Sequence, residues 1–144
     1  MDDYYQTLFL FYPPPETPFG WGLDLVAVRE ALVAGFPEAS GTFAGGGTPL
    51  YRLSFWARAE DGVEFEGLVS VEGRECVAVG EATVAEAARF VGWMRAAVVP
   101  PGGEIRFSSR AAFEGGFGER EWGVPPGAGV VEVLRGHLEE VLGG

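Results

Sequence analysis

The sequence predicts an α+β fold organised as one domain over residues 1–144. Helical and strand-like periodicities follow one another along the chain, and neither an internal repeat nor a dividing linker interrupts them. We expect a mixed or mostly antiparallel sheet of about five strands with three helices, in the order β-α-β-β-β-α-β-α and with the helices mainly on one face. A chain of this size buries about 70% of its unfolded surface, which is enough for a core without disulfides.

The first predicted strand spans residues 4–12, which are rich in aromatic and large aliphatic residues on both alternating faces. That pattern is typical of a strand covered on both sides, so we expect it inside the sheet. Three prolines at 13–15 cannot donate to a sheet ladder and end the strand. Asp24 then caps a helix that runs to about Gly35, and residues 40–49 are expected to form a loop. The buried stripe of that helix is Leu25, Val28, Leu32 and Phe36.

A hairpin over residues 50–71 is the clearest local prediction, because apolar and polar residues alternate in both of its arms. Pairing Ala59 with Val63 leaves a three-residue loop with Gly62 at the left-handed position that a type I turn plus bulge requires. A shift of one residue would turn the apolar face toward water, so the register is well determined. The other expected pairs are Ala57–Phe65, Phe55–Gly67, Leu53–Val69, Arg58–Glu64 and Trp56–Glu66.

A third strand at residues 75–79 follows the hairpin through a tight turn and completes a three-stranded meander. The helix after it is the element around which we expect the domain to be built. Thr83 and Glu86 fit a capping box, so this helix begins near Val84, and it ends before Pro100. Its buried stripe is Val84, Ala87, Ala88, Val91, Met94 and Val98.

The last third of the chain contains a strand at residues 104–108, which we expect beside the first strand, and a C-terminal helix over about 130–142. The glycine-rich residues 111–127 lie between them. A short strand around 119–124 is one interpretation of that segment.

Acidic residues outnumber basic ones by 21 to 10, and the formal net charge is −11. All ten basic residues are arginine. A chain of this sign is repelled by phosphate backbones and anionic lipid, so we expect neither nucleic acid nor membrane as a partner. The charge indicates either solubility alone or a surface that meets a basic partner.

Several catalytic mechanisms lack the residues that they need. Without lysine there is no Walker lysine and no Schiff base, so the triple glycine at 45–47 does not belong to a phosphate-binding loop. Cys76, the only cysteine, lies in an apolar run and is interpreted as a small buried hydrophobe. His137, the only histidine, borders the apolar stripe of the last helix and is interpreted as a packing residue.

We predict no metal, no cofactor and no catalytic residue, and therefore no enzyme. One histidine and one cysteine cannot supply the three or four ligands of a zinc site, and the aspartates show no calcium-loop spacing. A glycosidase acid–base pair of glutamates is also not favoured. The four glutamates considered for it are more simply solvent-facing; they are Glu64, Glu66, Glu119 and Glu121.

Aromatic residues at the surface are the remaining signal. At about 100° per residue, Trp93 falls opposite Val84 on the central helix, on the side expected to face water. Trp56 lies on the polar face of the hairpin, with the alternative that a helix covers it. Arg95 projects into the apolar stripe, where its charge would reach solvent or a glutamate. Tryptophan and arginine among carboxylates are residue types that dominate interface energies.

In size, charge and α+β pattern the chain is similar to bacterial immunity proteins, which neutralise a cognate toxin and commonly cover its basic active site. The resemblance is one of class, and no family residue is carried over. It implies a protein-binding function with a basic partner, the toxin or effector, and charge complementarity would speed association. The predicted partner-binding residues are Trp56, Arg58, Glu60, Asp61, Glu64, Glu66, Trp93, Glu119, Glu121 and Trp122.

Two alternative functions stay open. A secretion or effector chaperone would dimerise and grip an extended segment, whereas a small-ligand binder or enzyme would use a pocket near the triple-glycine loop at 45–47. The N-terminus is acidic where a secretory signal would be basic, and no apolar run approaches the roughly 20 residues of a membrane span. A cytoplasmic location is therefore expected.

Overall fold

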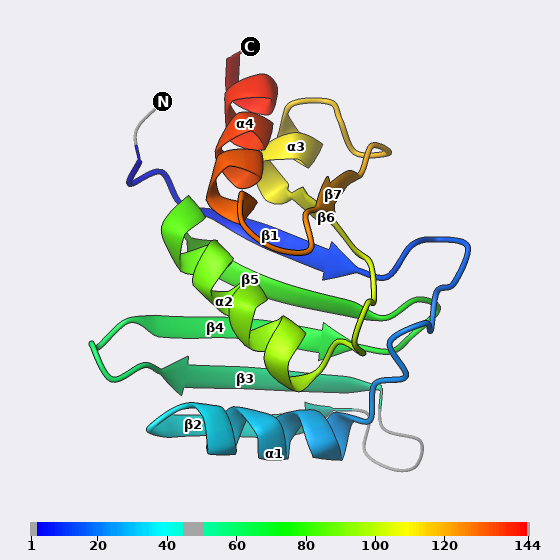
Figure 1. The fold of residues 1–144 in the computed structure, drawn as a ribbon, viewed down its shortest axis with the longest axis vertical. Helices are drawn as coiled ribbons and strands as arrows, with labels where there is room; N and C mark the ends of the chain where they lie inside the picture. The colour runs from blue at the N-terminus through cyan, green and yellow to red at the C-terminus, as the bar shows by residue number, and fades with distance from the viewer. Residues whose placement is uncertain (1–2, 45–50, 144) are drawn as a thin grey trace.

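The structure, a computed structural model, describes residues 3–44 and 51–143 (Figure 1). These residues form seven strands and four helices. The strands are β1 (Thr7–Tyr12), β2 (Glu38–Ala44), β3 (Arg52–Arg58), β4 (Glu64–Ser70), β5 (Cys76–Ala82), β6 (Ile105–Ser109) and β7 (Trp122–Val124). The helices are α1 (Leu25–Gly35), α2 (Val84–Ala97), α3 (Arg110–Glu114) and α4 (Val130–Gly143).

All seven strands belong to one sheet in the order β2-β3-β4-β5-β1-β6-β7, and every neighbouring pair is antiparallel. The α+β class is confirmed, and β1 lies inside the sheet with β6 beside it, as predicted. The prediction of about five strands and three helices is wrong, because the described residues contain two more strands and one more helix.

The three elements beyond the predicted five strands and three helices have weak local signals. β2 begins just before the segment 40–49 that we expected to be a loop and overlaps it. Its residues are mostly small or polar, and it is held by seven register pairs with β3. β7 has only three residues, within the stretch around 119–124 where a short strand was one interpretation. α3 is a single short turn that begins where the Ser109 hydroxyl accepts a hydrogen bond from the Ala112 amide. The triple glycine lies outside the described residues.

The β3–β4 hairpin has the predicted register. Phe55 pairs with Gly67, and the Ala59 amide donates to the Val63 carbonyl at 2.8 Å. Gly62 has a φ of 90°, the left-handed conformation that the bulged turn needs. A Cβ at Gly67 would lie 2.8 Å from the Phe55 ring, so the glycine makes the space that this ring occupies.

The helices begin as the capping signals predict. The Asp24 carboxylate accepts hydrogen bonds from the amides of the first turn of α1. At the start of α2 the Thr83 hydroxyl accepts from the Glu86 amide at 3.2 Å, and the Glu86 carboxylate accepts from the Thr83 amide at 2.9 Å. Both caps satisfy backbone donors that have no partner inside the helix.

The helices lie on one side of the sheet. Figure 1 shows α1, α2 and α4 in front of the strands, and α3 packs against α4 at the end of β6. We call the side under the helices the covered face. Its strand side chains are buried and include Phe9, Phe11, Leu53, Phe55, Phe65, Val69, Val77, Val79, Ile105 and Phe107.

The opposite side of the sheet, which we call the bare face, carries no helix of the described residues. Side chains alternate between the two faces along each strand, and the pairing registers show which residues of neighbouring strands share a face. The side chains on the bare face include Leu8, Leu10, Tyr12, Trp56, Leu68, Cys76, Ala78 and Ser108. The expectation that the first strand is covered on both sides is therefore wrong: Phe9 and Phe11 are fully buried, whereas Leu8 and Leu10 are half-buried.

A buried carboxylate ties down the connection between β1 and α1. Glu75, fully buried, accepts hydrogen bonds from the amides of Trp21 at 2.8 Å and Leu23 at 2.5 Å. The Trp21 indole donates to the Glu104 carbonyl at 3.0 Å. The connection is thus fixed to the turn before β5 and to the start of β6.

Candidate functional site

The bare face has an apolar centre. On β1 the side chains of Leu8, Leu10 and Tyr12 lie half-buried on it. Tyr12 pairs across the neighbouring strands with Arg106 and lies next to Cys76 of β5. Burial raises the pKa of the Cys76 thiol to about 11 and that of the Tyr12 phenol to about 12. The thiol therefore stays protonated at neutral pH, which agrees with its interpretation as a small hydrophobe.

Trp56 occupies the bare face nearer to β2. Its ring is half-buried, and its indole nitrogen donates to the Glu64 carboxylate at 2.8 Å. The Arg58 guanidinium lies 5.3 Å from the centre of the Trp56 ring and pairs with Glu38 at 2.9 Å and Glu64 at 3.7 Å. No described helix covers Trp56, so the alternative of a helix-covered core residue is wrong.

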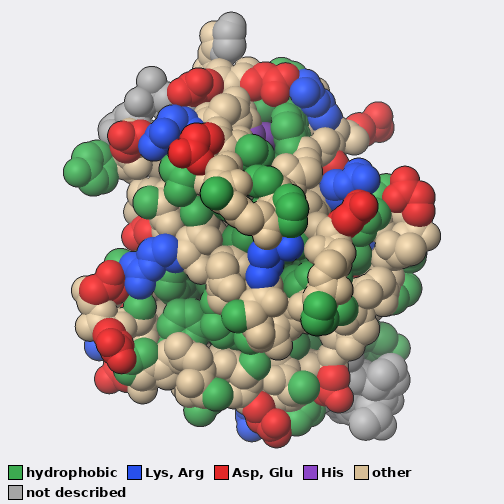
Figure 2. Space-filling model, in the orientation of Figure 1, with side chains coloured by type: hydrophobic (Ala, Val, Ile, Leu, Met, Phe, Trp, Pro, Cys, Tyr) green, Lys and Arg blue, Asp and Glu red, His purple; other side chains and the backbone are tan. Residues whose placement is uncertain are grey.

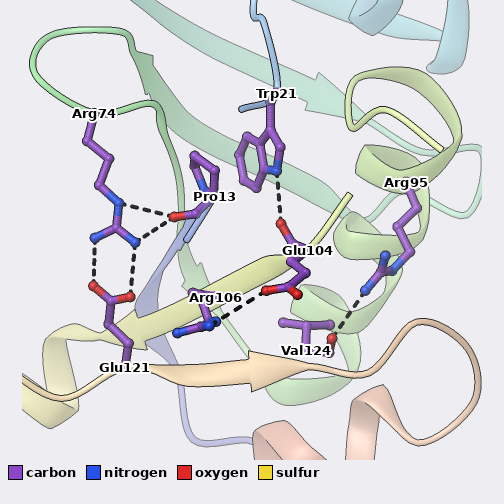
Figure 3. Close-up of polar contacts among 8 residues, drawn as sticks. All are labelled: Pro13, Trp21, Arg74, Arg95, Glu104, Arg106, Glu121 and Val124. Carbon is purple, nitrogen blue, oxygen red and sulfur yellow. Dashed lines mark hydrogen bonds and ion pairs between the residues drawn. The ribbon is translucent and has the colours of Figure 1, made fainter. Parts of the chain in front are cut away.

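Arg74, in the turn before β5, lies at the end of the bare face next to Tyr12. Its guanidinium lies 4.4 Å from the centre of the Tyr12 ring and donates two hydrogen bonds to Glu121, at 2.6 and 2.9 Å. It also donates to the Pro13 carbonyl at 3.1 and 2.5 Å (Figure 3). The bond from Arg74 lowers the pKa of the Glu121 carboxyl. This half-buried pair joins the turn before β5 to the start of β7.

The predicted partner-binding residues do not form one surface. Trp56, Arg58, Glu64 and Glu66 share the bare face, as their register pairs require. Glu60 and Asp61 are exposed at the hairpin turn beside them, where Asp61 pairs with an arginine of α2 at 2.9 Å.

Trp93 lies on the covered side and is not the solvent-facing residue that we expected. Its ring packs against Phe36 and Phe90, with centroid distances of 5.8 and 5.2 Å. A Cβ at Gly35 would lie 2.6 Å from the Trp93 indole nitrogen, so the end of α1 closes over the ring. The helical wheel could not show this contact, because it comes from an element far away in the sequence.

Trp122 is also on the covered side. It packs edge-on against His137 with a centroid distance of 4.1 Å, and its indole donates to Glu140 at 3.2 Å. Its neighbours in the sequence diverge: Glu121 pairs with Arg74, whereas Glu119 is exposed and makes no ion pair with a described residue. The predicted contact area of Glu119, Glu121 and Trp122 is therefore divided. Trp122 packs on the covered side, whereas Glu121 pairs with Arg74.

His137 is a buried packing residue, as interpreted from the sequence. Only 2% of it is exposed, and its Nε2 lies 2.8 Å from the Ser109 hydroxyl. Burial lowers the pKa of the imidazole to about 4. A serine–histidine contact can activate a nucleophile, but Ser109 is itself fully buried and caps α3, so a substrate could not reach it in this conformation.

The arginines are almost all neutralised within the described residues. Arg29 stacks on Phe43 at 4.9 Å, and Arg95 donates only to backbone carbonyls. Figure 2 shows acidic and basic side chains side by side over the helical side of the molecule. The other eight arginines form ion pairs: Arg52–Glu72, Arg58–Glu38, Arg74–Glu121, Arg89–Asp61, Arg106–Glu104, Arg110–Glu81, Arg120–Glu140 and Arg135–Asp3.

Much of the excess negative charge is carried by glutamates whose side chains have no partner among the described residues. Two of them, Glu60 and Glu66, lie on the hairpin near Trp56. The glutamates whose side chains make no ion pair or hydrogen bond with any described residue are Glu16, Glu30, Glu60, Glu66, Glu114, Glu119, Glu132 and Glu139. The electrostatic field of these carboxylates would attract a cationic partner.

Two adjoining hollows lie at the C-terminal end of α2. The larger has a volume of about 480 Å³ and the smaller about 410 Å³, and both are lined by Gly103 and Glu104. Trp21 lines the smaller hollow and Arg95 the larger (Figure 3). The pocket that we considered near the triple-glycine loop at 45–47 lies outside the described residues. The sequence feature that could have indicated the larger hollow is Arg95. It is a cation in the apolar stripe of α2, shortly before the Pro-Pro-Gly-Gly turn at 100–103.

Among residues 3–44 and 51–143 no cluster of histidine, cysteine or carboxylate side chains is suited to hold a metal ion. None of the helices in the same residues has the length and apolar character that crossing a membrane requires. No protein-family model, curated protein or solved structure matches the chain.

Proposed function

We propose that the protein is a small acidic protein-binding domain whose bare face docks a basic partner protein. The observation that carries the proposal is the composition of that face. Leu8, Leu10 and Tyr12 form its half-buried centre, and Trp56 with Arg58 lies toward one side. Tyrosine, tryptophan and arginine at a solvent-accessible surface are the residues that dominate binding energies in protein interfaces.

Charge supports a basic rather than an acidic partner. Arg58 and Arg74 on the bare face are neutralised by glutamates, whereas Glu66 on the same face has no cationic partner among the described residues. The whole chain carries a net charge of −11. Such a surface attracts a basic protein over a distance and raises its association rate.

The particular role that we propose is that of an immunity-type protein, which neutralises a cognate bacterial toxin in the cytoplasm by covering its basic site. The acidic charge and the uncovered apolar centre support this role. Binding alone would inhibit the toxin, so the protein would need no catalytic residue.

A charge-reversal experiment with a matched control tests the docking face. The partner to use is the product of a toxin-like reading frame next to the gene. Glu66→Arg on the bare face and Glu30→Arg on α1 change the net charge equally, and neither residue has an ion pair within the described chain. At low salt we expect Glu66→Arg to slow association about tenfold and Glu30→Arg to slow it by at most about twofold. Equal effects of the two substitutions would contradict docking on the bare face.

The edge strand β2 favours a second candidate, a secretion or effector chaperone. β2 presents a seven-residue edge without lysine or proline, and an extended segment can add to such an edge. A chaperone of this kind would be a dimer. Light scattering on the purified protein separates the candidates, because a mass of 15.4 kDa, that of one chain, contradicts the chaperone.

A further inference from the structure

The larger hollow at the end of α2 has the features of a ligand pocket. Its volume of about 480 Å³ is within the range of pockets that hold small molecules. Its walls are mainly apolar and come from the turn after α2 and from the end of β7. The apolar lining residues are Val99, Pro100, Pro101, Val124 and Pro126.

Arg95 supplies the charge of this pocket. One terminal nitrogen, Nη2, donates to the carbonyls of Val124 at 3.3 Å and Pro125 at 2.8 Å. These carbonyls fix the guanidinium in place but leave its positive charge uncompensated. The buried Nε has no acceptor among the described residues, and Nη1 has none either. Among the described residues, Arg95 is the only arginine in the lining of either hollow.

The larger hollow has one carboxylate in its lining, that of Glu104, and it makes no ion pair with Arg95. Glu104 pairs with Arg106 at 3.6 Å, and its side chain is 66% exposed (Figure 3). The backbone carbonyl of Glu104 accepts from the Trp21 indole, which holds the wall between the two hollows. In the lining of the larger hollow, Arg95 is therefore the one charged side chain without an oppositely charged partner among the described residues, in a molecule of net charge −11.

We propose that this pocket binds the carboxylate of a ligand with an apolar body. The guanidinium donates charge-assisted hydrogen bonds that suit a carboxylate, and the proline and valine walls suit a hydrocarbon or aromatic group. A single cation matches a monoanion, because a dianion such as phosphate would keep an excess charge that the acidic molecule repels. The carboxylate belongs to a free acid or to the C-terminus of a peptide. The inference is independent of docking on the bare face.

Binding of 3-phenylpropionate, compared with its neutral analogue 3-phenylpropionamide, tests the proposal. Titration followed by amide chemical shifts should show saturable binding of the acid at Val99, Gly102 and Val124, with the amide at least about tenfold weaker. Arg95→Met should weaken binding of the acid by about tenfold or more. The matched control is Arg29→Met, which removes the other arginine without a carboxylate partner and should leave binding unchanged.

A second variant separates loss of the site from loss of structure, because Arg95 also holds the end of β7. Pro126→Trp fills the pocket from its exposed rim while leaving Arg95 in place, and it should abolish binding without lowering the melting temperature. Equal binding of acid and amide, or Arg95→Met binding as tightly as the unchanged protein, would overturn the proposal.

The source of the carboxylate is resolved by a further pair of probes. A hexapeptide ending in valine is compared with its C-terminal amide. Tighter binding of the free-carboxylate peptide than of 3-phenylpropionate supports a peptide C-terminus as the ligand, and the reverse order supports a free acid. Failure of both carboxylates to bind at low salt overturns the site.

Discussion

The two faces of the sheet are built from the same strands but differ in what covers them. Along β1 the side chains alternate between fully buried Phe9 and Phe11 under the helices and half-buried Leu8 and Leu10 on the bare face. Both sets are apolar, so the strand alone does not distinguish them. What differs is the cover: α1, α2 and α4 lie on one side only. Folding therefore buries the apolar side chains of one face and leaves those of the other partly exposed to solvent.

The largest expected effect is a difference in stability between neighbouring residues of β1. Phe11→Ala should lower the free energy of unfolding by about 3–5 kcal/mol, because it opens a cavity in the core. Leu10→Ala should lower it by only about 1 kcal/mol, since the half-buried side chain can be replaced by solvent. Urea unfolding monitored by tryptophan fluorescence measures both. Equal losses would show that the bare face is as closely packed as the covered face.

The covered side also contains the group that should dominate the response to acid. Burial lowers the pKa of His137 from 6.5 to about 4. Between these values the unfolded chain binds a proton that the folded chain does not, so stability falls as the pH drops and changes little from this source above pH 6.5. The full loss amounts to about 3 kcal/mol.

The variant His137→Gln isolates this contribution, because it removes the titrating group while keeping a hydrogen-bonding side chain near Ser109. The stability difference between the two proteins should shrink as the pH is lowered from 6.5 to 4. A difference that stays constant over this window would show that the buried imidazole is not the group responsible.

The ion pair between Arg74 and Glu121, at the rim of the bare face, should contribute less to the free energy of unfolding than the buried residues of the covered face. Removal of the charge in Glu121→Gln should cost about 1 kcal/mol at neutral pH, because its pair with Arg74 is only half-buried and partly screened. Arg74 lowers the pKa of Glu121, so the contribution is present above the carboxyl's unfolded pKa and is lost as the pH falls through its folded value. The unfolding free energies of the two proteins should therefore converge in acid. A constant difference would contradict the ion pair.

Elements with strong local signals were predicted to the residue. The capping box of Thr83 and Glu86, the Asp24 cap and the hairpin register with Gly62 in its turn are all fixed by neighbours in the sequence. β2 was missed because a segment of small and polar residues becomes a strand only when β3 supplies its hydrogen bonds. The strand propensity of the segment itself does not include the stabilisation that pairing with β3 provides.

The candidate surface was predicted only in part. Alternation correctly grouped Trp56 with Glu64 and Glu66, because it determines which side chains share a face. For β1, whose side chains are apolar on both faces, it could not show which face the helices cover. Trp93 was placed wrongly for a related reason: the end of α1 closes over it. The Arg95 pocket depends on the meeting of α2, its following turn and β7, which no local pattern describes.

Cys76 provides the most direct test of whether the bare face is the docking surface. It is the only cysteine of the chain, and it lies half-buried on that face beside Tyr12. Its alkylation by iodoacetamide can be measured with and without saturating partner protein at a fixed alkaline pH. We predict that the bound partner slows alkylation by about tenfold or more, because interface cores exclude solvent and solutes. An unchanged alkylation rate at full occupancy would contradict docking on this face.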